Sequence, residues 1–153
     1  MIYQTFEALG FLTRLIESDY FYKGLIEVAL GIVLQADGAR STDSMTFYRY
    51  ETDKNQSGNS YFKMVDFRVP LAAEKRGKEF LYIVFTENIL LSTDSIINRF
   101  GHPIKIEVPT PQESSGTGVN VIYVYTLGKW VVSFSFGPGP QEILRSVSFD
   151  FPQ

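Results

Sequence analysis

The sequence predicts an α+β protein: an antiparallel sheet of about seven or eight strands, with about three helices on one face. Three segments have the apolar spacing or the capping residues of helices. Eight short segments have the alternation, or the β-branched and aromatic content, of strands. Aromatic residues make up 15% of the chain, which favours a sheet because aromatic side chains fit pleated surfaces.

The first two helices are predicted over residues 5–17 and 20–30. Apolar side chains recur in the first at steps of three and four residues, and Thr5 is its expected N-cap. Ser18 and Asp19 break this pattern and are expected to cap the second helix. Gly31 stands where a left-handed residue would end it.

A third helix is predicted over residues 94–100, with Ser92 or Thr93 as its cap and Gly101 as its end. The segments 35–44, 52–60 and 109–118 are polar and predict loops. The run 80–85 is apolar throughout, which is typical of a central strand buried on both faces. Strands are predicted over residues 32–34, 45–51, 61–69, 80–85, 104–108, 119–126, 129–136 and 143–151.

The chain of 153 residues predicts a single domain, 1–153, whose halves, 19–91 and 92–153, resemble each other. Each half is predicted to be a helix followed by a meander of strands. Gly31 and Gly101 are 70 residues apart, and the pairs Tyr48-x-Tyr50 and Tyr123-x-Tyr125 are 75 apart. Two tandem repeats would explain this order. Alternatively, any α+β domain can show two such runs.

The second half also resembles a known family. Phe100-Gly101-His102-Pro103 ends the predicted helix, Tyr123-Val124-Tyr125 and Gly128 follow, and Val147-Ser148-Phe149 lies in the last strand. This order resembles the unit of the β-lactamase-inhibitor-protein-like fold, a group that includes the SmpA/OmlA outer-membrane assembly lipoproteins. The resemblance implies a short helix and an antiparallel meander, carried twice in the inhibitor proteins. The chain lacks the cysteines of those inhibitors and of a lipidation site.

Composition excludes several chemistries. There are no cysteines and one histidine, so disulfides, thiolate nucleophiles and a multi-histidine metal site are excluded, and no cofactor or metal is predicted. The net charge of −3 argues against nucleic acid or an anionic membrane as the main partner. No run of 18 apolar residues predicts a membrane span. No signal peptide is visible, which favours the cytoplasm, although a periplasmic protein whose signal was removed fits too.

No catalytic constellation is found: there is no Gly-x-Ser-x-Gly, phosphate-loop or His-Glu-x-x-His pattern. His102 could act as a base near neutral pH, but no carboxylate is fixed beside it, and a helix C-terminus explains it as well. Asp66 lies in a predicted strand between Val65 and Phe67. It could be a surface residue beside Lys63 or Arg68, or an acid in a cleft.

The candidate partner-binding residues are aromatic: Tyr48, Tyr50, Tyr123, Tyr125 and Trp130. Tyrosine and tryptophan offer a large rigid contact area with a polar tip, and they are enriched at binding hot spots. The alternative is that the tyrosines form a half-buried sheet face covered by the helices.

We therefore expect a non-enzymatic protein-binding module of the inhibitor or immunity-protein kind. Loops 35–44 and 109–118 would plug a site on the partner, and the negative charge would steer a basic partner. One alternative is a small-ligand-binding or enzymatic domain of the nuclear-transport-factor-2-like type, in which Asp66 and His102 would meet in a cavity. Another is a secretion chaperone, although that family usually closes with a helix and this sequence ends in a predicted strand.

Overall fold

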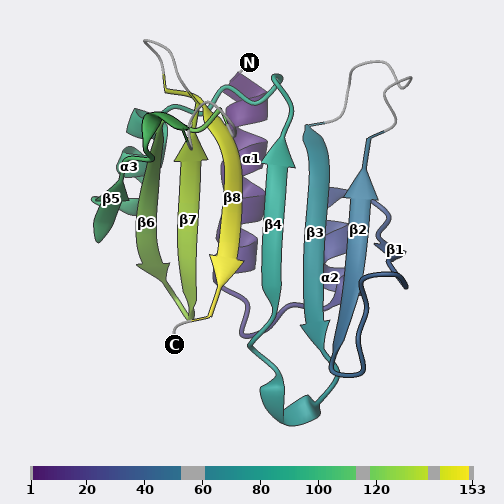
Figure 1. Cartoon of the computed structure of the whole chain (residues 1–153). Helices are drawn as coiled ribbons and strands as arrows, with labels where there is room; N and C mark the ends of the chain where they lie inside the picture. Colours follow the sequence, from purple (N-terminus) through teal and green to yellow (C-terminus); the bar gives the residue numbers. More distant parts are fainter. Residues whose placement is uncertain (1, 53–60, 113–117, 138–141, 152–153) are drawn as a thin grey trace.

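The structure, a computed structural model, describes residues 2–52, 61–112, 118–137 and 142–151, with side chains from residue 9 onward. Within these ranges eight strands form one antiparallel sheet (Figure 1), and its order is β1-β2-β3-β4-β8-β7-β6-β5. The strands are β1 (Gln35–Ala36), β2 (Met45–Glu51), β3 (Phe62–Pro70), β4 (Phe80–Phe85), β5 (Lys105–Glu107), β6 (Val121–Leu127), β7 (Trp130–Phe136) and β8 (Leu144–Asp150).

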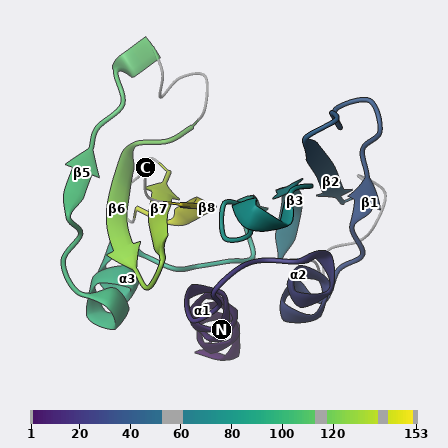
Figure 2. The same ribbon diagram turned by 90° about the horizontal axis from the view of Figure 1, so that it is seen from below.

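The three α-helices lie on the same face of the sheet, as Figure 2 shows from below. They are α1 (Ile2–Ile16), α2 (Lys23–Leu30) and α3 (Thr93–Phe100), and α1 lies between the other two. A short 3-10 helix, η1 (Ala73–Lys75), connects β3 to β4. The predicted α+β class, with eight strands and three helices, is confirmed.

Two meanders of the same order make up the sheet. Strands β1 to β4 pair in sequence, and so do β5 to β8. The meanders meet along β4 and β8, where Ile83 lies opposite Val147. α2 precedes the first meander and α3 precedes the second. This is the arrangement expected of two tandem repeats, and the duplication itself stays a prediction.

The core lies between the sheet and the helices. On β7 every second side chain is buried, namely Trp130, Val132, Phe134 and Phe136. The same alternation holds on β4, where Leu81, Ile83 and Phe85 are buried and the intervening side chains are half-buried. The strand is therefore central, as predicted, but the prediction that it is buried on both faces was wrong, because none of the described helices covers its second face.

The start of the second helix was predicted wrongly. α2 begins at Lys23, not Tyr20, and its N-cap residue Tyr22 makes no capping hydrogen bond through its side chain. The physical reason is long-range: the Phe21 N–H donates to the buried Glu79 carboxylate, which keeps this residue outside the helix. Asp19, expected as a cap, instead pairs with Lys129 at 3.3 Å.

Two further element boundaries differ from the predictions. α1 begins at Ile2, so Thr5 lies within the helix and is not its cap. The predicted strand 32–34 is absent, because Leu34 N–H donates at 2.9 Å to the carboxylate of Glu27, in the middle of α2. Strand β1 forms just after it, within the segment predicted as a loop.

Two glycine turns have a steric reason. Gly31 ends α2 with φ 66° and ψ 39°, the left-handed conformation that was predicted. Gly128, in the β6–β7 turn, has φ 60°, and a Cβ added there would lie 2.8 Å from the Ile16 carbonyl oxygen. A larger residue would therefore push α1 away from this turn.

Candidate functional site: the open face of the sheet

The face of the sheet opposite the helices is open and concave within the described residues. Figure 2 shows β5 and β6 at one end and β1 and β2 at the other curving away from the helices, so the sheet forms a trough. Because side chains alternate along a strand, the residues between the core positions point into this trough. We call this surface the open face.

Over the two strands β7 and β8 the open face carries small side chains, which we call the serine floor. Ser133 lies opposite Ser148, and Ser135 lies opposite Ser146. All four alternate with core residues and belong to the open face, but Ser146 is only 4% exposed, so the half-buried Ser133, Ser135 and Ser148 are the ones that reach its surface. Short hydroxyl side chains leave room for another chain to approach the sheet.

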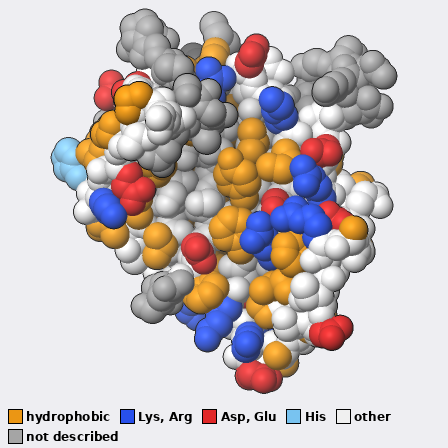
Figure 3. All heavy atoms as spheres, viewed as in Figure 1, with side chains coloured by type: hydrophobic (Ala, Val, Ile, Leu, Met, Phe, Trp, Pro, Cys, Tyr) orange, Lys and Arg blue, Asp and Glu red, His pale blue; other side chains and the backbone are white. Residues whose placement is uncertain are grey.

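Larger side chains gather over β2 to β4. In Figure 3, which views this face, hydrophobic and basic side chains lie together there. The basic group consists of Arg40, from the β1–β2 connection, and Arg49 and Arg68, from β2 and β3. We call these three arginines together with Asp66 the arginine cluster.

Asp66 is the centre of the arginine cluster. It is only 6% exposed, and its Oδ2 accepts hydrogen bonds from Arg40 Nη2 at 3.3 Å and Arg68 Nη2 at 3.2 Å. Arg49 lies opposite Asp66 in the β2–β3 register and pairs with Glu51 at 2.8 Å. A nearly buried carboxylate is costly without cationic partners, so Asp66 requires the arginines around it.

Aromatic rings hold two of these guanidinium groups in place. The Arg40 and Arg68 guanidinium carbons lie 4.9 and 5.0 Å from the centre of the Phe47 ring. Arg68 also lies 4.8 Å from the centre of the Phe80 ring. A guanidinium over an aromatic face is attracted by the ring quadrupole, so both positive groups are fixed before any ligand arrives.

Three polar atoms of the arginine cluster have no hydrogen-bond partner among the described residues. They are Asp66 Oδ1, Arg49 Nε and Arg68 Nε, and all three are buried. A buried polar atom without a partner typically costs about 1–3 kcal/mol. These atoms, two donors and one acceptor, are enclosed by the side chains around them, so the hydrogen bonding of the cluster is incomplete on its buried side.

The structure places the four predicted tyrosines on the helix side of the sheet. Tyr48, Tyr50 and Tyr123 are partly buried and pack against the core, while Tyr125 is 2% exposed. The Tyr125 hydroxyl donates to the Gly101 carbonyl at 2.8 Å. Burial raises the Tyr125 pKa above its ordinary value of 10.0, and the neighbouring Tyr123 raises it further.

Trp130 is a core residue with no exposed surface. Its indole stacks on Phe21, with the ring centres 4.1 Å apart, and donates from Nε1 to the Ser18 carbonyl at 2.9 Å. A fully buried side chain cannot touch a partner while the fold is intact. Trp130 and Tyr125 are therefore left out of the candidate site, although the sequence had suggested both.

The sequence did contain a signal for the arginine cluster. Alternation places Phe47 and Arg49 on one side of β2, and Asp66 and Arg68 on one side of β3. Pairing these strands as a hairpin would have brought the charges together. Arg40 could not have been found this way, because it reaches Asp66 from a connection 26 residues away.

Asp66 and His102 do not meet. Asp66 lies on β3, whereas His102 lies between α3 and β5, at the other edge of the sheet, and β4, β8, β7 and β6 lie between β3 and β5. At ~4.8 Å per strand spacing, the five spacings place these two strands roughly 24 Å apart along the sheet. Of the predicted plugging loops, 35–44 borders the open face and supplies Arg40, while residues 113–117 of the loop 109–118 lie outside the described residues.

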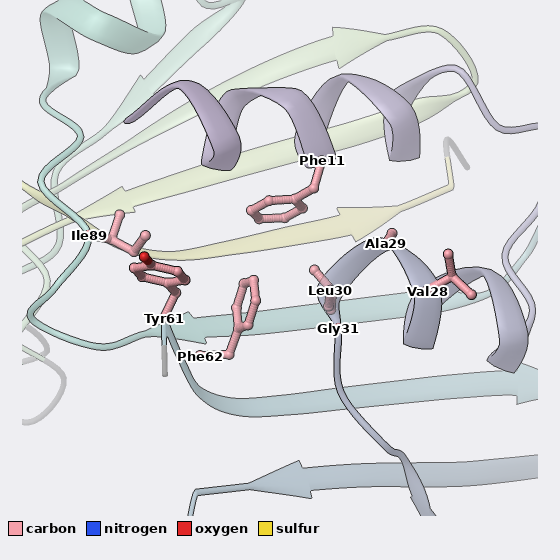
Figure 4. A pocket seen from close by; sticks show the side chains of 8 residues that line it. All are labelled: Phe11, Val28, Ala29, Leu30, Gly31, Tyr61, Phe62 and Ile89. Atoms are coloured by element: carbon pink, nitrogen blue, oxygen red, sulfur yellow. The ribbon is translucent and has the colours of Figure 1, made fainter. Parts of the chain in front are cut away.

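A separate pocket lies on the helix side of the sheet. It has a volume of about 300 Å³ and lies between α1, α2 and the start of β3. Figure 4 shows Phe11 pointing into it from α1, with Leu30 and Phe62 facing it from α2 and β3. The side chains that line it are apolar apart from the Tyr61 hydroxyl, and backbone atoms such as those of Gly31 also contribute to its wall.

In the part of the chain that the structure describes, no group of three or more His, Cys, Asp or Glu side chains could hold a metal ion. None of the helices found there is both long and apolar enough to cross a membrane.

The fold and its open face define an α+β protein in which one antiparallel sheet carries helices on a single side. No protein-family model and no curated protein sequence matches the chain. Among solved structures, the chain is similar to a DUF4309 family protein (YjgB) from Bacillus subtilis subsp. subtilis str. 168. That match has 12% identity and a TM-score of 0.39, and it covers 85% of this chain and 78% of the other.

Proposed function

We propose that this chain is a non-enzymatic protein-binding module whose open face receives the partner. The observation that supports the proposal is the sheet face left uncovered within the described residues, with preorganised side chains at its first half and a low serine floor at its second. The ion pairs and cation–π contacts of the arginine cluster stabilise the monomer, and they also hold its guanidinium groups in place on a solvent-facing surface. A partner surface that buries these groups gives them a use.

The mode of action would be occupation of the partner's surface, as an inhibitor or immunity protein does. A concave sheet face several strands wide can cover a convex surface or an extended segment. Rigid strands present the contact residues with little loss of conformational entropy on binding. No chemical step is required of the module.

Photo-crosslinking tests this proposal directly. A benzoylphenylalanine residue replaces Ser133, on the open face, and in a matched control replaces Val28, which is 77% exposed on α2. The proposal expects a crosslinked partner in source-cell extract from position 133, suppressed by excess unlabelled protein, and none from position 28. Crosslinks that come equally from both positions, or from position 28 only, would overturn it.

A second candidate function is small-ligand binding in the apolar pocket between α1 and α2. The pocket volume of about 300 Å³ supports it, since ligand sites of ~300–1,000 Å³ with apolar walls are typical. In that case an apolar fluorescent probe should bind with one-to-one stoichiometry and should be excluded by Ala29→Phe, which fills the pocket. Binding of the probe that is unaffected by this substitution would exclude the pocket as the site.

A further inference from the structure

We infer that the arginine cluster binds carboxylate side chains of an acidic segment of the partner protein. This inference rests on the proposed protein-binding function and specifies the partner's chemistry. It differs from the expectation drawn from the net charge of −3, which favours a basic partner. Local charge at the contact surface, and not the total, decides which groups fit there.

The cluster and its nearest acidic neighbour carry an excess positive charge. Three guanidinium groups face two carboxylates, those of Asp66 and Glu51. On the same face Lys105 and Glu107 pair with each other at 3.0 Å, on the distant strand β5, and so add no net charge. Asp150 lies on β8, with β4 between it and the strand of Arg68. Asp37 is a further carboxylate beside the cluster, but its Oδ1 accepts from the Arg40 backbone N–H at 3.3 Å, so the excess positive charge is that of the three guanidinium groups over the two carboxylates with which they pair.

The guanidinium groups are both accessible and preorganised. The side chains of Arg40, Arg49 and Arg68 are 36%, 39% and 36% exposed, so a partner can reach them from the trough. Asp66 and the rings of Phe47 and Phe80 already fix two of them. Little side-chain entropy remains to be lost when an anion binds.

The unpaired Nε atoms indicate how the carboxylate would bind. A guanidinium binds a carboxylate by two parallel hydrogen bonds, and the side-on form uses Nε and one Nη. Arg49 Nε and Arg68 Nε make no hydrogen bond to the described residues. Both Nε atoms are buried, so an arriving carboxylate would first meet the exposed part of each guanidinium group, and the side-on form requires the two arginine side chains to turn outward.

The serine floor favours a peptide segment as the source of the carboxylate. Ser148 lies next to Tyr82 across the β4–β8 seam, and Tyr82 lies next to Asp66, so one tyrosine separates the serine floor from the cluster. An extended backbone lying over Ser133, Ser135 and Ser148 would have their hydroxyls within reach for hydrogen bonds, and its acidic side chains would reach the arginines. A free small anion would use the cluster alone.

Peptide titration of the full chain followed by NMR tests the inference. The probes are a hexapeptide of alternating glutamate and glycine and a matched hexapeptide of alternating lysine and glycine. The acidic probe should cause saturable shifts of the Arg49 and Arg68 Nε–Hε signals and of backbone amides in β2 to β4, β7 and β8. The basic probe should cause none, and added salt should weaken binding. Shifts with the basic probe, or none with the acidic one, would overturn the inference.

Substitutions locate the site. Arg49→Gln leaves Asp66 with both of its arginine partners and should weaken binding of the acidic probe at least fivefold. Arg49→Lys keeps the charge but loses the bidentate geometry, and should fall between Gln and the native residue. Arg14→Gln makes the same charge change on α1, on the helix side, and should leave affinity unchanged. Equal losses for Arg49→Gln and Arg14→Gln would show a general charge effect and refute the site.

The two proposals can fail separately. If the photo-crosslinker at position 133 captures a partner but the acidic probe neither binds nor displaces it, the inference falls and the protein-binding function stands. If crosslinking favours the helix face while the acidic probe still shifts the cluster, the open face falls as the partner's binding site, and the cluster is an anion site with another purpose.

Discussion

Trp130→Phe should destabilise the fold markedly. The indole is fully buried, stacks on Phe21 and donates to the Ser18 carbonyl. Phenylalanine keeps an aromatic ring but removes the N–H donor and part of the ring volume. The substitution therefore tests whether this tryptophan serves the core or a partner.

The expected loss follows from these contacts. A lost hydrogen bond costs about 1 kcal/mol, and leaving the part-buried Ser18 carbonyl without its donor adds about 1 kcal/mol. The space left by the smaller ring adds about another 1 kcal/mol. The sum is about 2–3 kcal/mol, which corresponds to a fall in melting temperature of roughly 5–10 °C for a chain of this size.

Urea unfolding followed by far-ultraviolet circular dichroism measures this loss without relying on tryptophan fluorescence. Tyr22→Phe, at an aromatic side chain that is 51% exposed, is the matched control and should change stability by less than about 0.5 kcal/mol. A loss below about 1 kcal/mol for Trp130→Phe would refute the packing argument. Unchanged stability together with weaker partner binding would instead make Trp130 a contact residue.

Two further predictions concern buried polar groups. Glu79→Gln should lower the free energy of unfolding, measured in urea, by about 2 kcal/mol. The carboxylate accepts the N–H groups of Phe21 and Gly77, and an amide keeps only one of the two oxygens. A loss below about 1 kcal/mol would contradict this. For Tyr125 the folded-state pKa is raised above 10.0, so its contribution to stability is complete below that pH and is lost as pH rises through the raised value. Tyr125→Phe removes the hydrogen bond to Gly101 and should therefore lower the free energy of unfolding by about 1 kcal/mol at neutral pH. Above pH 10 the variant should lose less stability with rising pH than the native chain does. Parallel stability–pH profiles of the two chains would refute this.

Most of the sheet could be predicted from the sequence because its signal is local. Period-two alternation gave β2 its observed bounds, Met45–Glu51, and placed Phe47 and Arg49 opposite the tyrosines. The apolar run of β4 was also found with its observed bounds. The position and facing of these strands depend on which side chains point to the core, and the alternation of neighbouring residues indicates this.

The failures share a long-range cause. α2 starts late because Glu79, 58 residues further along, accepts the N–H of Phe21. Trp130 is buried because that same phenylalanine docks on it. Arg40 joins the candidate site through a contact with Asp66 across 26 residues. No periodicity within a short window carries such information. The tyrosine-based site stays a prediction, and its residues lie on the helix side of the sheet.

The position of β8 has a consequence for biosynthesis. Among the described strands it comes last in the chain, yet it lies between β4 and β7 at the centre of the sheet. On the ribosome, β4 and β7 therefore each expose bare backbone until residues 144–150 leave the exit tunnel. Stalled or shortened nascent chains would carry two sheet fragments with unpaired, aggregation-prone strand edges. Such chains should depend on chaperones far more than the finished polypeptide does.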